Sequence, residues 1–586
     1  MEPTRVFDLL AYQAAHFPQA DALAAKVGGT WVQTSTEQFV AQARGLARGL
    51  AALGLQPKDR VAIISANRPE WVIADYGIQM AGAISVPLYP TITPEDYRFI
   101  FQDSGTKLVL CGTDELLAKA RQAAEGMAEP PMLYTFDTVA GARHWTEIIG
   151  LQAQTPEAEL ERRMATVGPD DLYTIIYTSG TTGVPKGVML SHHNLIANIA
   201  GSLPAMPANE SARALSFLPL CHVYERMVMG IYVRCGVSVY FAESMETIGD
   251  NLKEVRPQLF TTVPRLLEKV YDKIVAKGRE LTGVKRALFF WALELGHRYE
   301  IGKPMGTWYD LQLGLANKLI FSKWREALGG NVLAIVSGAA ALQPRLARVF
   351  RAARIAVMEG YGLTETSPVI SVNRIEETGC RVGTVGLVID NVQVHIADDG
   401  EILVKGPSVF LGYWNRPDLT AEAIDAEGWF HTGDIGEITE GKFLKITDRK
   451  KEIFKTSGGK YIAPQPLENK LKESMVVEQA MVVGEGERFP SALIVPSFDA
   501  LRSWCKLKGL AYTTDAQMIE HPAVLDKFQA EIDKLNQDLA QYEKIKKFCL
   551  LPALWTIERG EITPTLKLRR KAILHNYKSQ MEALYA

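Results

Sequence analysis

A loop rich in glycine and hydroxyl side chains, residues 177–187 (YTSGTTGVPKG), has the residue types that phosphate chemistry needs. It follows a run of β-branched and aromatic residues at 172–177, which predicts a strand, and an apolar segment begins at Val188. Glycines let the backbone turn sharply with its NH groups pointing inward, the hydroxyls add donors, and Lys186 adds a positive charge. The loop is therefore predicted to be a cradle for a polyphosphate.

Two other interpretations of this loop are weaker. A P-loop needs a lysine followed by Ser or Thr, whereas Lys186 lies between Pro185 and Gly187. A flexible surface linker would share the Ser, Thr and Gly content, but it needs neither an embedded Pro-Lys-Gly nor a strand that looks buried directly before it.

The longer segment 177–195 (YTSGTTGVPKGVMLSHHNL) resembles the signature of the adenylate-forming enzymes, which include acyl-CoA synthetases, luciferases and the adenylation domains of peptide synthetases. The resemblance implies ATP binding and attack of a carboxylate on the α-phosphate. The ATP-binding residues that it implies in this loop are Thr178, Ser179, Gly180, Thr181, Thr182, Gly183 and Lys186.

A second motif, residues 359–366 (EGYGLTET), places hydroxyl and carboxylate groups where they could meet a nucleotide and its magnesium, a hard cation that takes oxygen ligands. By resemblance Thr364 bonds the α-phosphate and Glu365 ligates Mg²⁺, with Thr178 as a second ligand. Without the resemblance, Glu365 would be interpreted as a surface carboxylate. The further nucleotide-binding residues implied here are Glu359, Gly360, Tyr361 (beside the adenine) and Gly362.

A strand followed by a turn of small residues is predicted at 332–342 (VLAIVSGAAAL). Gly338, Ala339 and Ala340 would leave a flat surface for a purine ring, because larger side chains would hold the base away. A plain strand end is the alternative; in the family the matching turn stacks on adenine.

The substrate side of the site is expected between residues 214 and 274. His222 comes just past a strand-like run, and it is either a packed core histidine or the family's catalytic histidine beside the acyl-adenylate. Residues 233–241 look like the next strand. Residues 257–274 (PQLFTTVPRLLEKVYDKI) resemble the long-chain fatty acid members, with a strand ending and a helix beginning around Pro264.

An extra helical region is predicted from about 278 to 330. Lys285 and Arg286 precede an apolar stripe, so residues 285–300 are either a peripheral membrane helix or an ordinarily packed one.

Short strands broken by glycines are expected between residues 400 and 441. Asp434 matches the family's ribose ligand, since a carboxylate can accept hydrogen bonds from both ribose hydroxyls, although an isolated Thr-Gly-Asp is usually a turn. The charge run 445–452 follows. By resemblance Arg449 is a second ribose ligand, Lys451 is the hinge and Lys455 lies near the nucleotide.

The C-terminal part looks like a compact α+β lid, with strands at 476–483 and 491–495 and a helix at 523–539. Residues 456–464 resemble the segment that lines the CoA tunnel, which involves Gly458, Gly459 and Lys460. Lys567 matches the catalytic lysine. Many members have Ser-Gly before that lysine, whereas this chain has Thr-Leu, so Arg569, Arg570 and Lys571 stay open as alternatives.

Composition sets outer limits on these interpretations. A chain of 586 residues predicts two or more domains, and 64 basic against 67 acidic residues give no sign of a nucleic-acid partner. Six scattered cysteines and a charged N-terminus without an apolar core favour a cytoplasmic protein, peripheral to a membrane at most. We expect an α/β fold, with a large domain at 1–447, which includes a β-rich subdomain, and a mobile α+β lid at 448–586.

The resemblance implies a long-chain fatty acid-CoA ligase that uses ATP, Mg²⁺ and coenzyme A. Lys567, Lys186 and His222 would be its catalytic residues. Two alternatives remain: an enzyme that passes the same acyl-adenylate to a carrier protein, and a lipid-binding adaptor without catalysis. The sequence leaves open the chain length, the oligomeric state and the use of the product.

Overall fold

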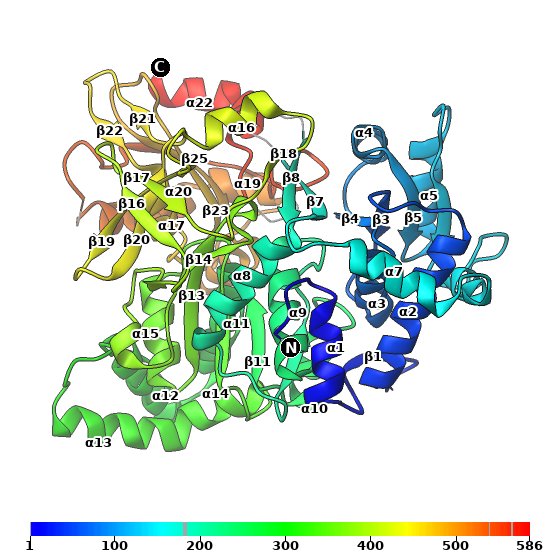
Figure 1. The fold of residues 1–586 in the computed structure, drawn as a ribbon. Coiled ribbons are helices and arrows are strands. Elements are labelled where there is room, and N and C mark those ends of the chain that lie inside the picture. The colour runs from blue at the N-terminus through cyan, green and yellow to red at the C-terminus, as the bar shows by residue number, and fades with distance from the viewer. Residues whose placement is uncertain (1, 180–184, 538, 564–566) are drawn as a thin grey trace. The chain divides into compact units, whose positions relative to one another are not determined.

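The computed structural model describes residues 2–179, 185–537, 539–563 and 567–586. The described residues divide into two compact units, and Figure 1 labels their helices and strands. Unit 1 comprises residues 1–395, 403–431 and 442–444, and unit 2 comprises 396–402, 432–441 and 445–586. The linear division at residue 447 stays a prediction. Each unit is described by itself below.

The first sheet of unit 1 has the strand order β18-β8-β7-β4-β3-β5-β6, and its centre is parallel. Helices α4 and α5 bury Tyr97, Phe101 and Leu117 against the core of this sheet, while α3 contacts β3 and β4 and packs along α2. The bounds are α2 (Thr36–Ala52), β3 (Arg60–Ile64), α3 (Pro69–Met80), β4 (Ile84–Leu88), α4 (Pro94–Ser104), β5 (Thr106–Cys111), α5 (Asp114–Ala124) and β6 (Met132–Thr135).

The second sheet of unit 1 contains the run β13-β12-β11-β9-β10, whose neighbours are parallel. Thr262 pairs with Ser337, and Ser337 pairs with Glu359, so β11 and β12 end level with Glu359 of β13, which continues to Gly362. The predicted strand end before Pro264 is confirmed, because α11 starts at that proline. The bounds are β9 (Arg213–Ser216), β10 (Ser238–Phe241), β11 (Leu259–Thr262), α11 (Pro264–Glu280), β12 (Ala334–Ser337) and β13 (Ala356–Gly362).

A buried ion pair ties the two sheets together. Arg226, in α9 (Val223–Cys235), donates from Nε to Asp75 Oδ2 of α3 over 2.9 Å, and from Nη1 to Thr174 Oγ1 of β7 (Leu172–Ser179) over 2.8 Å. Both charged side chains are almost fully buried. Since a charge is buried at low cost only when it is paired, the ion pair holds α9 against α3, and the bond to Thr174 holds α9 against β7.

Two strand predictions are wrong. Residues 233–235 are the last turn of α9, which ends at Gly236 with φ 71°, and β10 begins only at Ser238. Because α9 is buried on nearly all sides, its sequence lacks the periodicity that separates a helix from a strand. The Thr-Gly-Asp segment around Gly433 is not a turn between short strands, since it lies inside the ten-residue strand β19 (Phe430–Thr439).

The extra helical region is confirmed as α12 (Gly283–His297), α13 (Thr307–Ala316) and α14 (Ser322–Ala327). The apolar face of α12 packs inward: a Cβ on Gly296 would come within 2.6 Å of Val349 in α15 (Pro344–Ala352). Packing against a neighbour thus accounts for much of the stripe at 285–300. Within the described ranges, none of the helices combines the length and hydrophobicity needed to cross a membrane.

Unit 2 contains a three-stranded sheet with helices on both faces. Alternate residues of β23 enter different cores: Ala480 and Val482 pack with α20, whereas Met481 and Val483 pack with the C-terminal helices. The period of two is that of a strand buried on both faces, and the predicted α+β lid is confirmed as a fold. The bounds are α17 (Pro464–Leu471), β23 (Val477–Val483), β24 (Ser491–Pro496), α20 (Pro522–Asn536), β25 (Lys547–Leu550), α21 (Arg570–Asn576) and α22 (Lys578–Tyr585).

Candidate active site

The carboxyl edge of the parallel strands in unit 1 gathers several predicted site residues. After β12 the chain turns through Gly338, Ala339 and Ala340, and Ala339 has φ 69°, in the left-handed region. Gly338 lies against the ring of Tyr224, where a Cβ would be 3.2 Å from Cε1. In open α/β sheets, ligands bind at the carboxyl ends of the strands. The turn predicted to meet the adenine therefore lies on a suitable edge.

Glu359 positions that turn. Its side chain is buried at the end of β13, where Oε1 accepts a hydrogen bond from the backbone N–H of Leu342 over 2.8 Å. Burial raises the pKa of Glu359 to about 8. The carboxyl is therefore largely protonated at neutral pH. In this structure it holds the backbone of the turn through its hydrogen bond with Leu342.

The motif after Glu359 needs its second glycine. A Cβ on Gly362 would lie 1.7 Å from the carbonyl oxygen of Pro368, whereas one on Gly360 would make ordinary contacts. The tight approach leads β13 into the short 3₁₀ helix Thr364–Thr366. Thr364 is buried there, and Tyr361 is half-buried at the strand end. Backbone crowding thus fixes where Thr364 and Glu365 stand.

Tyr413 connects two predicted phosphate-side residues. Its hydroxyl donates to Glu365 Oε1 over 2.9 Å, and Lys186 Nζ lies 5.2 Å from the centroid of its ring. Burial and the neighbouring Glu365 raise the pKa of Tyr413 well above its ordinary value, so the hydroxyl stays a neutral donor. Sequence reasoning missed Tyr413, because only the folded chain pairs β18 (Gly412–Tyr413) with β8 (Pro185–Ser191).

The two strands that flank the glycine-rich loop pair with each other. Strands β7 and β8 are antiparallel, with Thr178 paired to Lys186. The two residues predicted to meet the phosphates are therefore cross-strand neighbours. The loop residues Gly180, Thr181, Thr182 and Gly183, and the side chain of Ser179, lie outside the described part of the chain.

The donors in unit 1 fit magnesium only as a partner of substrate phosphates. Within the described residues, no group of three His, Cys, Asp or Glu side chains could hold a metal ion. Mg²⁺ is commonly bound through one or two carboxylates together with phosphates and water. The carboxylate of Glu365 and the hydroxyl of Thr178 are donors of that kind.

His222 caps helix α9. Its Nδ1 accepts a hydrogen bond from the backbone N–H of Tyr224 over 3.1 Å, so a neutral ring carries its proton on Nε2. The residue begins a helix and does not directly follow the strand, because β9 already ends at Ser216. The ring is half-buried, and its role stays a prediction.

Glu225, three residues into the same segment, was missed. It is buried between two strands, where it accepts hydrogen bonds from Ser216 Oγ over 2.6 Å and from the hydroxyl of Thr261. Burial raises the pKa of Glu225 to about 7. Ser216 is the last residue of β9, and Thr261 lies in β11. Glu225 therefore connects the start of α9 to these two strands. Its neighbours come together only in the folded chain.

In unit 2 the two predicted ribose ligands contact each other. Arg449 Nε lies 3.1 Å from Asp434 Oδ1, and the Asp434 side chain is 5% exposed. Glu401, which the sequence analysis did not name, contacts residues next to both ligands. Its Oε1 accepts a hydrogen bond from the Gly433 N–H over 2.9 Å, and its Oε2 pairs with Lys450 over 2.8 Å. Gly433 has φ 73° within β19, and the hydrogen bond from Glu401 therefore holds its backbone in this conformation.

The hinge candidate follows β20 (Phe443–Arg449). Lys451 is exposed in a turn, and nearby Asp448 is buried, with Oδ1 accepting from the Arg449 N–H over 2.6 Å. Burial, with smaller effects of Glu452 and Glu468, raises the pKa of Asp448 to about 7. A buried carboxyl thus adjoins the predicted pivot.

The predicted CoA-side residues form one small hairpin. Strand β21 (Phe454–Lys455) pairs with β22 (Tyr461–Ile462), and Gly459 has φ 78° in the turn between them. The Thr456 N–H donates to the Lys460 carbonyl over 2.9 Å, which closes the turn. Lys455 Nζ lies 5.3 Å from the centroid of the Tyr461 ring. Gly458, Gly459 and Lys460 are all exposed.

Lys567 is joined to Thr563 by two hydrogen bonds. The Thr563 N–H donates to the Lys567 carbonyl over 2.8 Å, and the Lys567 N–H donates to Thr563 Oγ1 over 3.1 Å. The side chain of Lys567 is exposed, as are those of Arg569 and Lys571. Arg570 differs, because it is paired with Glu468 over 2.6 Å and is largely buried. The geometry removes Arg570 from the alternatives.

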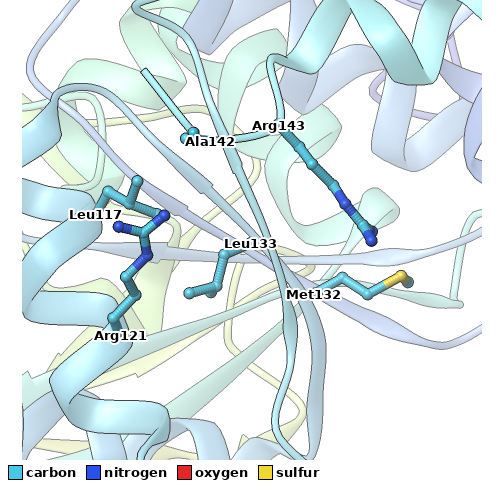
Figure 2. A pocket seen from close by; sticks show the side chains of 7 residues that line it. Leu117, Arg121, Met132, Leu133, Ala142 and Arg143 are labelled. Carbon is cyan, nitrogen blue, oxygen red and sulfur yellow. The ribbon is translucent and has the colours of Figure 1, made fainter. Parts of the chain in front are cut away.

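Two hollows of unit 1 involve none of the predicted site residues. The first, of about 380 Å³, lies beside β6, where Leu117 and Arg121 extend from α5 and Met132 and Leu133 from the strand (Figure 2). The second, of about 500 Å³, lies between the end of α12 and the start of α13. The candidate site in unit 1 therefore lies along the carboxyl edge of the parallel strands, and neither hollow forms part of it.

Comparisons with known proteins assign the chain to a family. The family described as AMP-binding enzyme matches residues 10–414, and the AMP-binding enzyme C-terminal domain matches residues 451–586. The chain belongs to the AMP-binding enzyme family.

The curated relatives are long-chain fatty acid–CoA ligases and synthetases. The chain is 35% identical over 570 residues to the long-chain-fatty-acid–CoA ligase FadD15 of Mycobacterium bovis, covering 95% of this chain and 93% of that protein. It is 33% identical to the peroxisomal long chain acyl-CoA synthetase 7 of Arabidopsis thaliana, with 94% and 81% covered. It is 34% identical to the mouse long-chain-fatty-acid–CoA ligase 5, with 90% and 80% covered.

Solved structures agree on the fold. The adenylation domain of a carboxylate reductase from Mycobacterium chelonae has a TM-score of 0.76 at 22% identity, covering 99% of this chain and 91% of that one. The anthranilate CoA ligase AuaEII has a TM-score of 0.73 at 17% identity, covering 99% and 98%. The predicted α/β class is confirmed.

We expect Glu359 to make the stability of the protein depend on pH. Its pKa of about 8 in the folded state lies above the ordinary 4.5, so between these values the folded protein holds a proton that the unfolded chain has released. Stability therefore falls as pH rises through this window. In urea melts between about pH 5 and pH 9, wild type should lose about 1–3 kcal/mol relative to Glu359→Gln.

The matched control is Glu125→Gln, at an exposed position of the same unit. Its difference from wild type should not change with pH. A constant difference for Glu359→Gln as well would contradict the assignment of a buried, protonated carboxyl.

Proposed function

We propose that the protein activates long-chain fatty acids with ATP and transfers them to coenzyme A, releasing AMP and pyrophosphate. The observation that carries the proposal is the match to long-chain-fatty-acid–CoA ligases over 95% of the chain. The site residues named by the sequence occupy the carboxyl edge in unit 1 and the Asp434 and Lys567 regions in unit 2, and this supports it.

The first half-reaction joins the fatty carboxylate to the α-phosphate. Two anions must approach, so catalysis depends on positioning and positive charge. Lys567 bridges the carboxylate and the α-phosphate, and Lys186 steadies the departing pyrophosphate. Glu365 and Thr178 would hold Mg²⁺, which neutralises phosphate charge when bound.

The resemblance assigns nucleotide contacts to several segments of the chain. The turn at Gly338, Ala339 and Ala340 lies flat against the adenine, while Tyr361 packs beside it and Thr364 bonds the α-phosphate. Asp434 accepts hydrogen bonds from the ribose hydroxyls, and Arg449 keeps its carboxylate oriented. His222 stands at the carbonyl of the adenylate, where its Nε2 proton can be donated.

The second half-reaction needs the lid to move. A thiol cannot reach the adenylate carbonyl while Lys567 occupies that side, so the lid predicted at 448–586 rotates about Lys451. The rotation withdraws Lys567 and brings the hairpin turn with Gly458, Gly459 and Lys460 alongside the pantetheine. Rigid rotation about a few residues is a common form of domain closure.

The direct test is pyrophosphate release with ATP and Mg²⁺ over fatty acids from short to very long, with and without CoA. We expect CoA-dependent turnover that is highest with long chains. Lys567→Ala should lower the first half-reaction by about a hundredfold or more, because a charge that stabilises the transition state is lost. Lys571→Ala, an exposed neighbour, should stay within about twofold of wild type.

Other results would point elsewhere. Release that needs a carrier protein in place of CoA would favour carrier transfer, and fatty acid binding without any release would favour the adaptor. If Lys571→Ala lost activity and Lys567→Ala kept it, the lysine assignment would be wrong.

Lys451→Pro should separate the two half-reactions. Proline fixes φ near −65° and so restricts the rotation of the chain at the hinge. Adenylate formation, followed by pyrophosphate release in a single turnover, should stay within about threefold, whereas thioester formation should slow by about tenfold or more. Lys451→Ala serves as the control for loss of the charge, and an equal fall in both half-reactions of the proline variant would sink the hinge assignment.

A further inference from the structure

Helix α13 presents an exposed apolar stripe. Trp308, Leu311 and Leu315 are 73%, 69% and 49% exposed, and Leu319, in the turn that continues the helix, is 41% exposed. Spacings of three and four residues put such positions on one face of a helix. The helix lies at the outer edge of its neighbours in unit 1 (green in Figure 1).

The stripe is not needed to hold α13 in place. The opposite face attaches the helix to α12, because the Tyr309 hydroxyl donates to the Leu295 carbonyl over 2.6 Å and Trp291 Nε1 donates to Gln312 Oε1 over 3.3 Å. Single exposed apolar residues are normal on protein surfaces, but a contiguous set that includes a tryptophan marks a contact surface.

Basic side chains border the stripe. Lys318 follows Leu315 by three residues and Lys323 follows Leu319 by four, and both lysines are exposed. The acidic Asp310 falls two residues after Trp308, on another side of the helix. The charge next to the stripe is therefore positive.

The neighbouring helix adds to this positive charge. The bonds from Trp291 to Gln312 and from Tyr309 to Leu295 show that α12 runs antiparallel to α13, and the same register brings Lys285 and Arg286 level with Lys318. Over residues 281–330 seven basic residues face four acidic ones, a net +3, although the whole chain has −3.

We propose that α13 docks on the surface of an anionic lipid bilayer. Trp308 and the three leucines would enter the boundary between headgroups and acyl chains, and Lys318 and Lys323 would meet the phosphates, which is the arrangement of interfacial amphipathic helices. The proposal rests on the proposed function, because long-chain fatty acids partition into bilayers. It moves the membrane contact expected at 285–300 chiefly to α13.

A second copy of the chain is a poorer occupant. Most homodimers are two-fold symmetric, and a symmetric contact through this stripe would bring together two surfaces that both carry an excess of basic residues, a net +3 over residues 281–330. Like charges repel there, whereas anionic headgroups attract them.

The test is flotation of the full chain with vesicles of phosphatidylcholine alone or mixed with phosphatidylglycerol. We expect binding to the mixed vesicles that weakens as salt rises. The double variant Leu311→Ser with Leu315→Ser should lower the partition coefficient by about tenfold or more. Lys318→Gln with Lys323→Gln should remove most of the preference for anionic vesicles.

The matched control is Leu507→Ser in unit 2. Leu507 is 87% exposed in α18 (Phe498–Lys508) and stands between Lys506 and Lys508, so it has the same residue types without a stripe. This variant should bind vesicles as wild type does.

Three results would overturn the proposal. These are no vesicle binding by wild type, equal binding by the α13 variants, and a wild-type dimer in light scattering that the leucine variants dissociate while vesicles are not bound. Pyrophosphate release without vesicles is measured for every variant with a long-chain fatty acid that is kept in solution on albumin. Activity that persists without vesicle binding overturns only the docking surface, whereas absence of release from wild type concerns the proposed function.

Discussion

The parallel register of β11, β12 and β13 is the constraint on which the candidate site depends. β11 ends at Thr262 and β12 ends at Ser337, and both ends are level with Glu359 of β13. The segments that follow β11 and β12 therefore leave the sheet beside residues 360–362 of β13. Each departing segment is then fixed by a short-range contact: the turn after β12 by the buried Glu359, and the segment after β13 by the crowding at Gly362. The chemistry attributed to these segments follows from their shared position.

Unit 2 holds its own residues independently. Arg449 orients Asp434, Glu401 holds the kink before it, and Thr563 closes the turn that carries Lys567. None of these contacts requires a residue of unit 1. Of these contacts, the one between Thr563 and Lys567 lies wholly after Lys451, so the lid at 448–586 can change its orientation in the proposed reaction without breaking it. This suits an enzyme with two successive half-reactions.

The sequence predicted elements whose patterns are local. Pro264 marks the start of α11, and the alternation around Ala480 marks a strand with two buried faces. It failed at 233–241, where a helix buried on nearly all sides has no distinguishing period, and at Gly433, where a glycine bends a strand without ending it. The residue types around these positions are compatible with a helix or a strand in the first case, and with a turn or a strand in the second.

The candidate site shows the same limit. Residues inside contiguous motifs, such as Thr364 and Glu365, could be named from the sequence. Tyr413, Glu225 and Glu401 could not, because each acts through partners that are remote in the chain or on another strand. These three residues hold other site segments in position, and their hydrogen-bond partners are brought to them only by the fold.

The most direct measurement is the affinity for a stable acyl-adenylate mimic, a long-chain acyl sulfamoyl adenosine, determined by calorimetry for wild type, Tyr361→Ala and Asp434→Ala. The account predicts that the mimic binds far more tightly than AMP or the fatty acid alone, and that a change in either unit weakens it by about tenfold or more. Affinity no better than that of AMP, or unchanged affinity in both variants, would contradict a single adenylate held by both units.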